Sequence, residues 1–435
     1  MRWFVAIHAV LCFLTPSALA DILLVHADGS GNYPTIQYAI AQASWGDTVQ
    51  LADGRFTGSG NRDLTYNGKP ITIQSQSGNA EDCIIDCQGT SEDCHRGFDF
   101  HWTESPNSVL QRVTIANGYM YTSGDITLDM LGGGIHIGEN CNPTLIDVIV
   151  RDCTGPVGGG VYIHNNSSEF VGCTFKNNTA WYGHGGGVSS TNGSPSFIDC
   201  IFERNTSLQG GAGMDGYGHE ALTVTGCWFR DNTEGDCPGL ALVGSQTEIT
   251  RTTFARNSYG ALEISSCSDG VHLDECTFYG NTGYMGHDAA ASVVAVGDVS
   301  ILIENSIIAF GVDAPAVGCI YDATVTLSCC NLYGNNAGDW VGCIADQYGV
   351  NGNISEDPLF CAPDYDDFNL QEGSPCAPFS PPNEECDLIG AWSGACHPPQ
   401  FVCCVGLECS VVTEVECDAM GGDWMNDPPQ VTCAP

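Results

Sequence analysis

The segment Cys173-Thr-Phe-Lys-Asn-Asn178 recurs four more times along the chain, each time with a central Phe and a final Asn. The copies are Cys200-Ile-Phe-Glu-Arg-Asn205, Cys227-Trp-Phe-Arg-Asp-Asn232, Thr252-Thr-Phe-Ala-Arg-Asn257 and Cys276-Thr-Phe-Tyr-Gly-Asn281. Weaker copies centre on Ile149, Ile307 and Leu332, and successive central residues are 24 to 29 positions apart. A second motif, two or three glycines before an apolar residue, runs in phase with the first at Gly132, Gly158, Gly185 and Gly210.

This period predicts an all-β fold, a right-handed parallel β-helix in which each unit makes one coil. Each unit holds two or three short strands with alternating apolar residues, and helical periodicity is nearly absent. The repeats predict about twelve coils between residues 70 and 375, stacked at the strand spacing of a sheet. A propeller needs longer blades, and a leucine-rich horseshoe needs a Leu framework that the chain lacks. A β-sandwich is the remaining structural rival.

Stacking turns each repeated position into a column that runs along the rod. We expect the Phe column to fill the core, with the Cys column two residues earlier facing inward beside it. Cys173, Cys200 and Cys227 are interpreted as small buried apolar residues, and disulfides between adjacent coils are the alternative. The Asn column is expected at a turn, where the amides bond one another along the stack.

The paired motifs resemble the repeats of bacterial polymorphic outer-membrane proteins and related secreted right-handed β-helix proteins. The stretch from His26 to Ile40 is similar to the opening of pectate-lyase-like β-helices. That resemblance implies a short helix over residues 35–44 that caps the first coil. The run from Ile354 to Trp392 resembles the closing segment of many bacterial secreted β-helices. The membrane-barrel domain of the autotransported members is missing, so attachment to a membrane by that route is not expected.

Residues 1–20 have the pattern of a secretory signal peptide, which ends in Ser17-Ala-Leu-Ala20. No later stretch approaches the length of a membrane span, so we expect a mature chain without a transmembrane segment, secreted or at the cell surface. The β-helix is assigned to residues 21–395. Residues 396–435 are rich in cysteine and are expected to form a small module held by disulfides, with a zinc site as the alternative.

The chain carries 52 acidic and 12 basic residues, for a formal charge of −40. Such a surface repels a phosphate backbone, so nucleic-acid binding is not expected. An apolar content of 43% is enough for a core and excludes a disordered chain. The surplus of carboxylates makes Ca²⁺ a candidate cofactor, held by Asp364, Asp366 and Asp367. Solubility in salty surroundings is an equally simple explanation of that surplus.

Aligning the Gly runs places one outward-facing column beside them, which reads His136, Tyr162, Ser189, Asp215, Ala241 and Glu263. These side chains could line a groove that grips a sugar chain, with Tyr162 and Trp181 stacking on the rings. Asp215 and Glu263 lie two coils apart, about 9.6 Å by the sheet spacing, which is compatible with an inverting pair of carboxylates. A merely solvated strand face is the plain alternative.

Other catalytic signals are weak. Gly183-His184-Gly185 matches a triplet of polygalacturonases, but their Asn-Thr-Asp and Arg-Ile-Lys motifs are missing, so His184 is interpreted as a loop residue. Arg151, Arg204 and Arg256 are aligned in one column and interpreted as part of a charge-balanced turn. The candidate catalytic residues are therefore Asp215, Glu263, His136 and His184.

We predict an exported binding or adhesion protein for polysaccharide or cell-surface glycans. The alternative is a polysaccharide-degrading enzyme, pectate-lyase-like or a glycoside hydrolase, with its site on the same groove. A structural spacer that binds no ligand is a third hypothesis. The fold alone does not choose among them, because β-helix proteins include both enzymes and non-catalytic adhesins.

Overall fold

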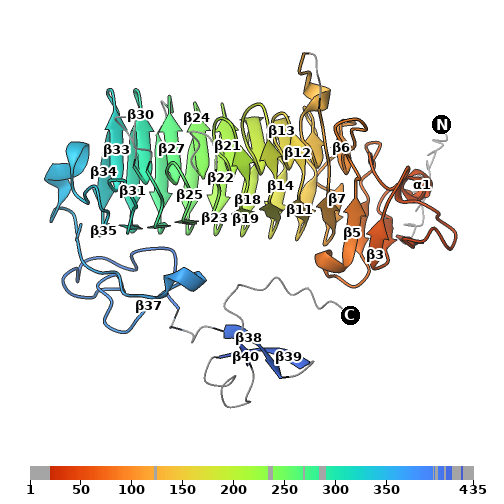
Figure 1. The fold of residues 1–435 in the computed structure, drawn as a ribbon. Helices are drawn as coiled ribbons and strands as arrows, with labels where there is room; N and C mark the ends of the chain where they lie inside the picture. Colours follow the sequence, from red (N-terminus) through yellow and green to blue (C-terminus); the bar gives the residue numbers. More distant parts are fainter. Residues whose placement is uncertain are drawn as a thin grey trace, which may run out of the picture.

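The computed structural model describes residues 20–121, 125–233, 239–267, 270–283, 291–394 and 396, together with the strands at 400–405, 408–413 and 423–424. Within these residues the chain winds as a parallel β-solenoid of about eleven turns, which Figure 1 shows as a rod. The predicted fold class is confirmed, although the coils run from residue 22 to residue 333 rather than from 70 to 375. Residues 1–19, most of the predicted signal peptide, lie outside the described residues.

Each full coil places one strand in each of three parallel sheets, named here A, B and C. Sheet A comprises β1 (Ile22–Val25), β2 (Thr48–Leu51), β4 (Thr72–Ser75), β7 (Val109–Gln111), β10 (Thr144–Ile146), β14 (Glu169–Val171), β18 (Ser196–Ile198), β22 (Leu222–Thr225), β25 (Thr247–Thr250), β28 (Val271–Asp274), β31 (Ser300–Glu304) and β34 (Thr324–Ser328). Sheet B comprises β3 (Gly54–Phe56), β5 (Cys83–Asp86), β8 (Thr114–Ala116), β11 (Ile149–Arg151), β15 (Thr174–Lys176), β19 (Ile201–Glu203), β23 (Trp228–Arg230), β26 (Thr253–Ala255), β29 (Thr277–Tyr279), β32 (Ile307–Ala309) and β35 (Asn331–Tyr333).

Sheet C follows sheet B in every coil, after a turn that holds a short fourth sheet in the middle of the rod. Sheet C comprises β6 (Phe98–Phe100), β9 (Ile135–Ile137), β13 (Val161–Asn166), β17 (Val188–Gly193), β21 (Met214–Tyr217), β24 (Leu240–Val243), β27 (Leu262–Ser265), β30 (Val293–Val296) and β33 (Val317–Ile320). The short sheet comprises β12 (Thr154–Gly155), β16 (Thr179–Ala180) and β20 (Thr206–Ser207). Sheets B and C therefore occupy different sides of the rod (Figure 1).

The Phe column of sheet B forms the core as predicted. The rings of Phe175, Phe202 and Phe229 lie over one another, with centroids 5.0 and 4.4 Å apart, and none is exposed. The stack continues through Phe254 and Phe278 at 5.0 and 4.8 Å. Parallel offset rings at this distance contribute more than their buried area alone.

Two members of the Phe column were predicted one residue too early. Val150, not Ile149, pairs with Phe175, and Ile308, not Ile307, pairs with Phe278. Both errors arise where two apolar residues are adjacent and the final Asn of the motif is absent. For the same reason Arg151 aligns with Lys176 and does not share the column of Arg204 and Arg256.

The Cys column is buried and unbridged. Cys173, Cys200 and Cys227 are free thiols whose Sγ atoms lie 3.4–3.5 Å from backbone carbonyl oxygens of the preceding coil. Burial raises the pKa of each buried thiol in this column where a shift is resolved, to about 12 at Cys276 and Cys330. Suppressing the thiolate makes these residues inert, so they act as the small buried groups that the sequence predicts.

The Asn column forms a continuous hydrogen-bonded ladder at the end of sheet B. In Asn205, Oδ1 accepts the backbone N–H and the Nδ2 amide of Asn178 at 3.0 and 3.1 Å, while its own Nδ2 donates to the Phe175 carbonyl. The same pattern links Asn205 to Asn232. It continues through Asn257 to Asn281, and all five amides are fully buried. Each buried amide is thereby satisfied by the neighbouring coil.

The first coil is capped by helix α1 (Ile36–Gln42), as the sequence implies. The Thr35 side chain accepts the backbone N–H of Tyr38 at the helix start, and Ile36, Ala39 and Ile40 are buried against the core. At the other helix end, Lys69 Nζ donates to the carbonyls of Ile40, Ala41 and Ala43. A cation there satisfies the carbonyls and complements the helix dipole.

The last coil is covered by the 3-10 helix η3 (Gly342–Gln347), which packs on β33 and β34. A disulfide between Cys319 and Cys343 ties this helix to sheet C. Its residue Ile344 is fully buried. Three shorter 3-10 helices complete the described helical structure: η1 (Ala80–Asp82), η2 (Leu128–Met130) and η4 (Pro363–Tyr365). No helix among the described residues is long and apolar enough to cross a membrane.

Residues 355–394, called here the closing segment, leave the coil and fold back along the outer face of sheet B (Figure 1). They carry the antiparallel strands β36 (Phe360–Ala362) and β37 (Asp367–Leu370). Phe368 packs on Trp228 and Tyr279, and Trp392 Nε1 donates to Thr253 Oγ1. The disulfide Cys329–Cys386 ties the segment to the last coil, and Cys361–Cys396 joins its first strand to the chain just after its end.

The C-terminal tail contains a three-stranded antiparallel sheet of β38 (Gln400–Val405), β39 (Glu408–Thr413) and β40 (Asp423–Trp424). Cys396, at its start, pairs with Cys361 of the closing segment. The pairing of the five cysteines that follow lies outside the described side chains.

Replacing Phe202 by Ala should lower the free energy of unfolding by about 3–5 kcal/mol, because it removes a buried ring from the middle of the column and leaves a cavity. Urea denaturation followed by circular dichroism measures the loss. Tyr321→Ala is the control, since Tyr321 is 85% exposed. Its removal should change the stability by less than about 0.5 kcal/mol. Equal effects of the two substitutions would contradict the stacked core.

Candidate functional site

The outer face of sheet C carries the column singled out in the sequence. The strand register pairs His136 with Tyr162, Tyr162 with Ser189, and Ser189 with Asp215. Ala241 and Glu263 continue it on β24 and β27. The structure adds Asp99 on β6, which pairs with His136 and extends the column by one strand. The alternation Phe98-Asp99-Phe100 was the signal that could have placed it.

The Gly runs fold back over the start of each sheet C strand. A Cβ on Gly185 would lie 2.6 Å from the Cβ of Ser189, in the outward column, and the φ of Gly185 is +70°. Only glycine therefore fits this turn. The turns and neighbouring coils cover the column, so His136, Tyr162 and Asp215 are 7%, 4% and 6% exposed. The column is a tightly covered polar layer rather than the open groove that the sequence predicts.

Tyr162 is enclosed between two histidines. Its ring is nearly parallel to those of His136 and His164, with centroids 5.9 and 6.3 Å away. His164 Nδ1 lies 2.9 Å from Thr191 Oγ1, and the Tyr162 hydroxyl lies 3.4 Å from the same oxygen. Burial raises the pKa of Tyr162, which keeps the phenol protonated. Tyr162 thus fixes the histidines in place and does not offer a free ring face to a sugar.

Asp99 organises the N-terminal end of the column. Its Oδ1 lies 2.8 Å from His136 Nδ1 and its Oδ2 lies 3.2 Å from His101 Nδ1. Arg96, which is buried, donates to the backbone carbonyls of Leu131 and Asp129. Burial alone would raise the pKa of Asp99, but the hydrogen bond from His136 and the charge of Arg96 lower it below its usual value. Asp99 is therefore a carboxylate that orients two imidazoles.

A second Asp–His pair lies further along the rod. Asp215 Oδ1 lies 3.4 Å from His184 Nδ1 and 3.4 Å from the backbone N of Gly211. The hydrogen bond to Asp215 raises the pKa of His184 above its usual value. The His184 side chain is 48% exposed, so this imidazole reaches solvent while its carboxylate partner stays buried. The structure thus brings together two residues that the sequence placed in separate motifs.

Three aromatic side chains cluster in the turns that precede sheet C strands, with Tyr182 two residues before His184. Trp181 lies between Tyr121 and Tyr182, with ring centroids 5.2 and 5.9 Å away, and its Nε1 donates to the Met120 carbonyl. Tyr121 and Tyr182 are 42% and 60% exposed. We call these three residues the aromatic cluster. Trp181 was predicted from the sequence, whereas the two tyrosines were missed because they lie in turns that have no repeat position.

Glu263 occupies the predicted column two strands beyond Asp215, with Ala241 between them. Ala241 is 5% exposed, so the position between the two carboxylates is covered. Asp215, however, is engaged by His184 and by the backbone of its own turn. A proton exchanged at Asp215 would therefore pass through His184, the exposed member of that pair.

The carboxylates proposed for Ca²⁺ have other partners. Asp366 lies 2.6 Å from both Arg230 and Arg256 and holds the closing segment against sheet B. Asp367 Oδ1 accepts from the backbone N and the side-chain amide of Asn369. Asp364 lies near Tyr279. Burial chiefly raises the pKa of Tyr279, and the charge of Asp364 raises it further. In the described part of the chain no group of three His, Cys, Asp or Glu side chains could hold a metal ion.

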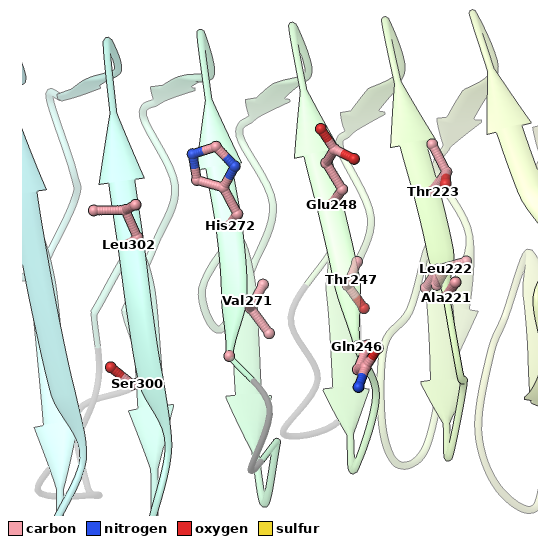
Figure 2. A pocket seen from close by; sticks show the side chains of 11 residues that line it. Ala221, Leu222, Thr223, Gln246, Thr247, Glu248, Val271, His272, Ser300 and Leu302 are labelled. Carbon is pink, nitrogen blue, oxygen red and sulfur yellow. The ribbon is translucent and has the colours of Figure 1, made fainter.

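A trough of about 660 Å³ lies on the outer face of sheet A, which the sequence did not single out. Figure 2 shows Thr223, Glu248, His272 and Leu302 on four successive strands of its floor, in one register column. His272 Nε2 lies 3.0 Å from Glu304 Oε2 beside it. The trough mixes polar and apolar side chains and has its own acid–imidazole pair in His272 and Glu304, but the described residues that line it include no Phe, Tyr or Trp.

No family model and no curated protein matches the chain. Among solved structures, pectate lyase Pel9A is similar over 86% of this chain and 96% of its own, with a TM-score of 0.56 and 13% identity. The chain has the pectate-lyase-like β-helix fold. The A-module of the Azotobacter vinelandii mannuronan C-5 epimerase AlgE4 covers 71% of this chain and 90% of its own, at 13% identity and a TM-score of 0.32. An alginate lyase from Paenibacillus covers 70% of this chain and 99% of its own, at 15% identity and a TM-score of 0.29.

At 13% identity the likeness to pectate lyase Pel9A shows the shared β-helix alone. The expectation of a pectate-lyase-like superfold is thereby confirmed. Function has to be argued from the side chains of this β-helix, because one fold hosts many chemistries.

Replacing Asp215 by Asn should lower the pKa of His184 toward its ordinary value of about 6.5, because the carboxylate favours the charged imidazole. The raised pKa means that the pair stabilises the fold below the ordinary His pKa, and that this contribution is lost as pH rises through the raised one. NMR titration of the His184 ring measures the shift. His272, paired with Glu304 on sheet A, is the control, and a His184 pKa unchanged by D215N would rule out the pairing.

Proposed function

We propose that the chain is an exported or cell-surface protein that binds polysaccharide along sheet C. The observation that carries the proposal is the aromatic cluster beside an ordered series of imidazoles and carboxylates. Exposed aromatic rings give apolar contact to the flat faces of sugars. Imidazole, hydroxyl and carboxylate groups at fixed positions bond to sugar hydroxyls and set the orientation of the chain.

The repeat itself supports a polymeric ligand. Successive strands of sheet C present a side chain at the same register position along the rod, from Asp99 to Glu263. Most of this column is covered, so a linear polymer would meet the exposed groups of the turns above it, His184 and the aromatic cluster. The β-helix shared with a pectate lyase is consistent with this proposal. Disulfides at Cys319, Cys329 and Cys361 support a location outside the reducing cytosol.

A second candidate function is cleavage or modification of the bound glycan. Asp99–His136 and His184–Asp215 are Asp–His pairs of the kind that move protons in catalysis. His184 is the better-placed member, since its ring reaches solvent while Asp215 holds its orientation. In this candidate His184 acts as the general acid or base, and Asp215 positions it.

Tyr182→Ala should weaken binding to the best ligand on a glycan array by about tenfold, equal to about 1.4 kcal/mol, because Tyr182 is the most exposed residue of the cluster. Calorimetric titration measures the change. Tyr348→Ala is a matched control, since Tyr348 is 58% exposed against 60% for Tyr182 but lies at the end of the rod. Equal losses in both variants, or none in Y182A, would argue against a site on sheet C.

The two candidate functions differ in turnover. A binding protein leaves each array ligand intact on prolonged incubation, as judged by chromatography of the products. An enzyme forms product, and His184→Gln should then abolish product formation while Tyr348→Ala leaves it unchanged. Product formation that survives H184Q, D215N and E263Q together would exclude the proposed catalytic groups.

A further inference from the structure

Positive charge is distributed unevenly over the rod. Of the 12 Lys and Arg residues of the chain, eight lie on strands of sheet B or in the turns that flank them: Arg55, Arg112, Arg151, Lys176, Arg204, Arg230, Arg251 and Arg256. No strand of sheet C contains Lys or Arg. After Arg256 the sequence has no Lys or Arg at all.

The cation nearest to the sheet C column is not available to a ligand. Arg96 is 5% exposed, and its guanidinium donates inward to the backbone carbonyls of Leu131 and Asp129. It also lies close enough to Asp99 to lower the pKa of that carboxyl. The charge of Arg96 therefore holds η2 with the residue that follows it, and the first carboxylate of the column.

The cations of sheet B are neutralised as well. Arg230 pairs with Glu203 and Asp366, and Arg256 pairs with Asp231 and Asp366. The closing segment covers this part of sheet B. Arg55, Arg112 and Arg204 each pair with a carboxylate as well, so the described part of sheet B offers a polyanion few unpaired cations.

The column on sheet C carries the carboxylates Asp99, Asp215 and Glu263. Its compensating positive charge can come only from histidines, above all His184 and His136. No strand of sheet C adds a Lys or Arg to these carboxylates, so the column is acidic. Carboxylates or sulfates of a ligand would meet like charges at short range, without cations to pair with them.

We infer that the polysaccharide bound along sheet C carries no acidic groups: it is uncharged or bears free amines. This inference rests on the proposed glycan-binding function and assigns its substrate class. Uncharged sugars bond through hydroxyls to His184 and other exposed groups of the turns, and protonated amines gain attraction from the carboxylates beneath them. The chain thus differs in its charge chemistry from a β-helix that binds polyuronates through cationic side chains.

The test uses the full mature chain and three hexasaccharide probes: hexagalacturonate, the hexamer of N-acetylglucosamine and its deacetylated, amine-bearing form. A glycan array that contains neutral and uronate polymers widens the comparison. Affinities are measured at about 20 mM and about 500 mM salt, since screening shortens the reach of charges. We expect the best uncharged or amine-bearing ligand to bind at least about tenfold more tightly than any uronate at low salt.

Tyr217→Lys adds one cation at an exposed position of β21, beside Asp215. It should improve uronate binding by about threefold or more at low salt. Thr326→Lys, on the exposed face of sheet A, is the control and should leave uronate binding unchanged. Equal gains in both variants would show a net-charge effect and not a property of sheet C, and would overturn the inference.

The inference and the proposed function fail in different ways. A uronate that binds as tightly as any uncharged or amine-bearing glycan, with or without added Ca²⁺, and loses affinity in Tyr182→Ala, overturns the inference but keeps glycan binding on sheet C. Absence of binding to every probe and to the array overturns the proposed function itself.

Discussion

The buried column of asparagine amides is the interaction on which the rest of the structure depends. From Asn205 to Asn281, each amide accepts from the main chain and the side chain of the preceding coil and donates to a carbonyl of that coil, as Asn205 does with Asn178 and Phe175. A buried amide without these partners would cost about 1–3 kcal/mol. An Asn in one coil therefore requires a matching partner in the next. The ladder fixes the register of sheet B, and the stacked Phe rings fill the space beneath it.

That register also decides what the rod presents outward. Because the turn after sheet B is fixed, the Gly run that follows begins at the same place in each coil and folds over the start of sheet C. The outward side chains there lie in register but are largely covered, as the 4% exposure of Tyr162 shows. More exposed groups lie in the turns, among them His184 and Tyr182, and at strand ends such as Tyr217. The polar layer beneath orients them, so the surface combines rigid support with accessible side chains.

Much of the core and of the outward series could be predicted from the sequence, because the same residue types recur at the same position of each repeat. The Phe, Cys and Asn positions repeat visibly, and so does the outward series from His136 to Glu263. Errors appeared where the pattern was degenerate, as at Ile149 and Val150, where either apolar residue could face inward. The burial of Tyr162 was not predictable, because it depends on how closely a turn approaches the next strand. The role of Asp366 was equally hidden, since its partner Arg230 lies 136 positions away in the sequence.

Both ends of the solenoid are closed by elements that do not repeat, α1 at one end and η3 with its disulfide at the other. Open strand edges would otherwise template the addition of further molecules. The interior coils from Phe175 to Phe278, in contrast, offer the same Asn and Phe partners to one another. The architecture therefore separates two properties: the terminal elements keep the molecule a discrete particle, while duplication or loss of a whole coil can lengthen or shorten it without disturbing either end.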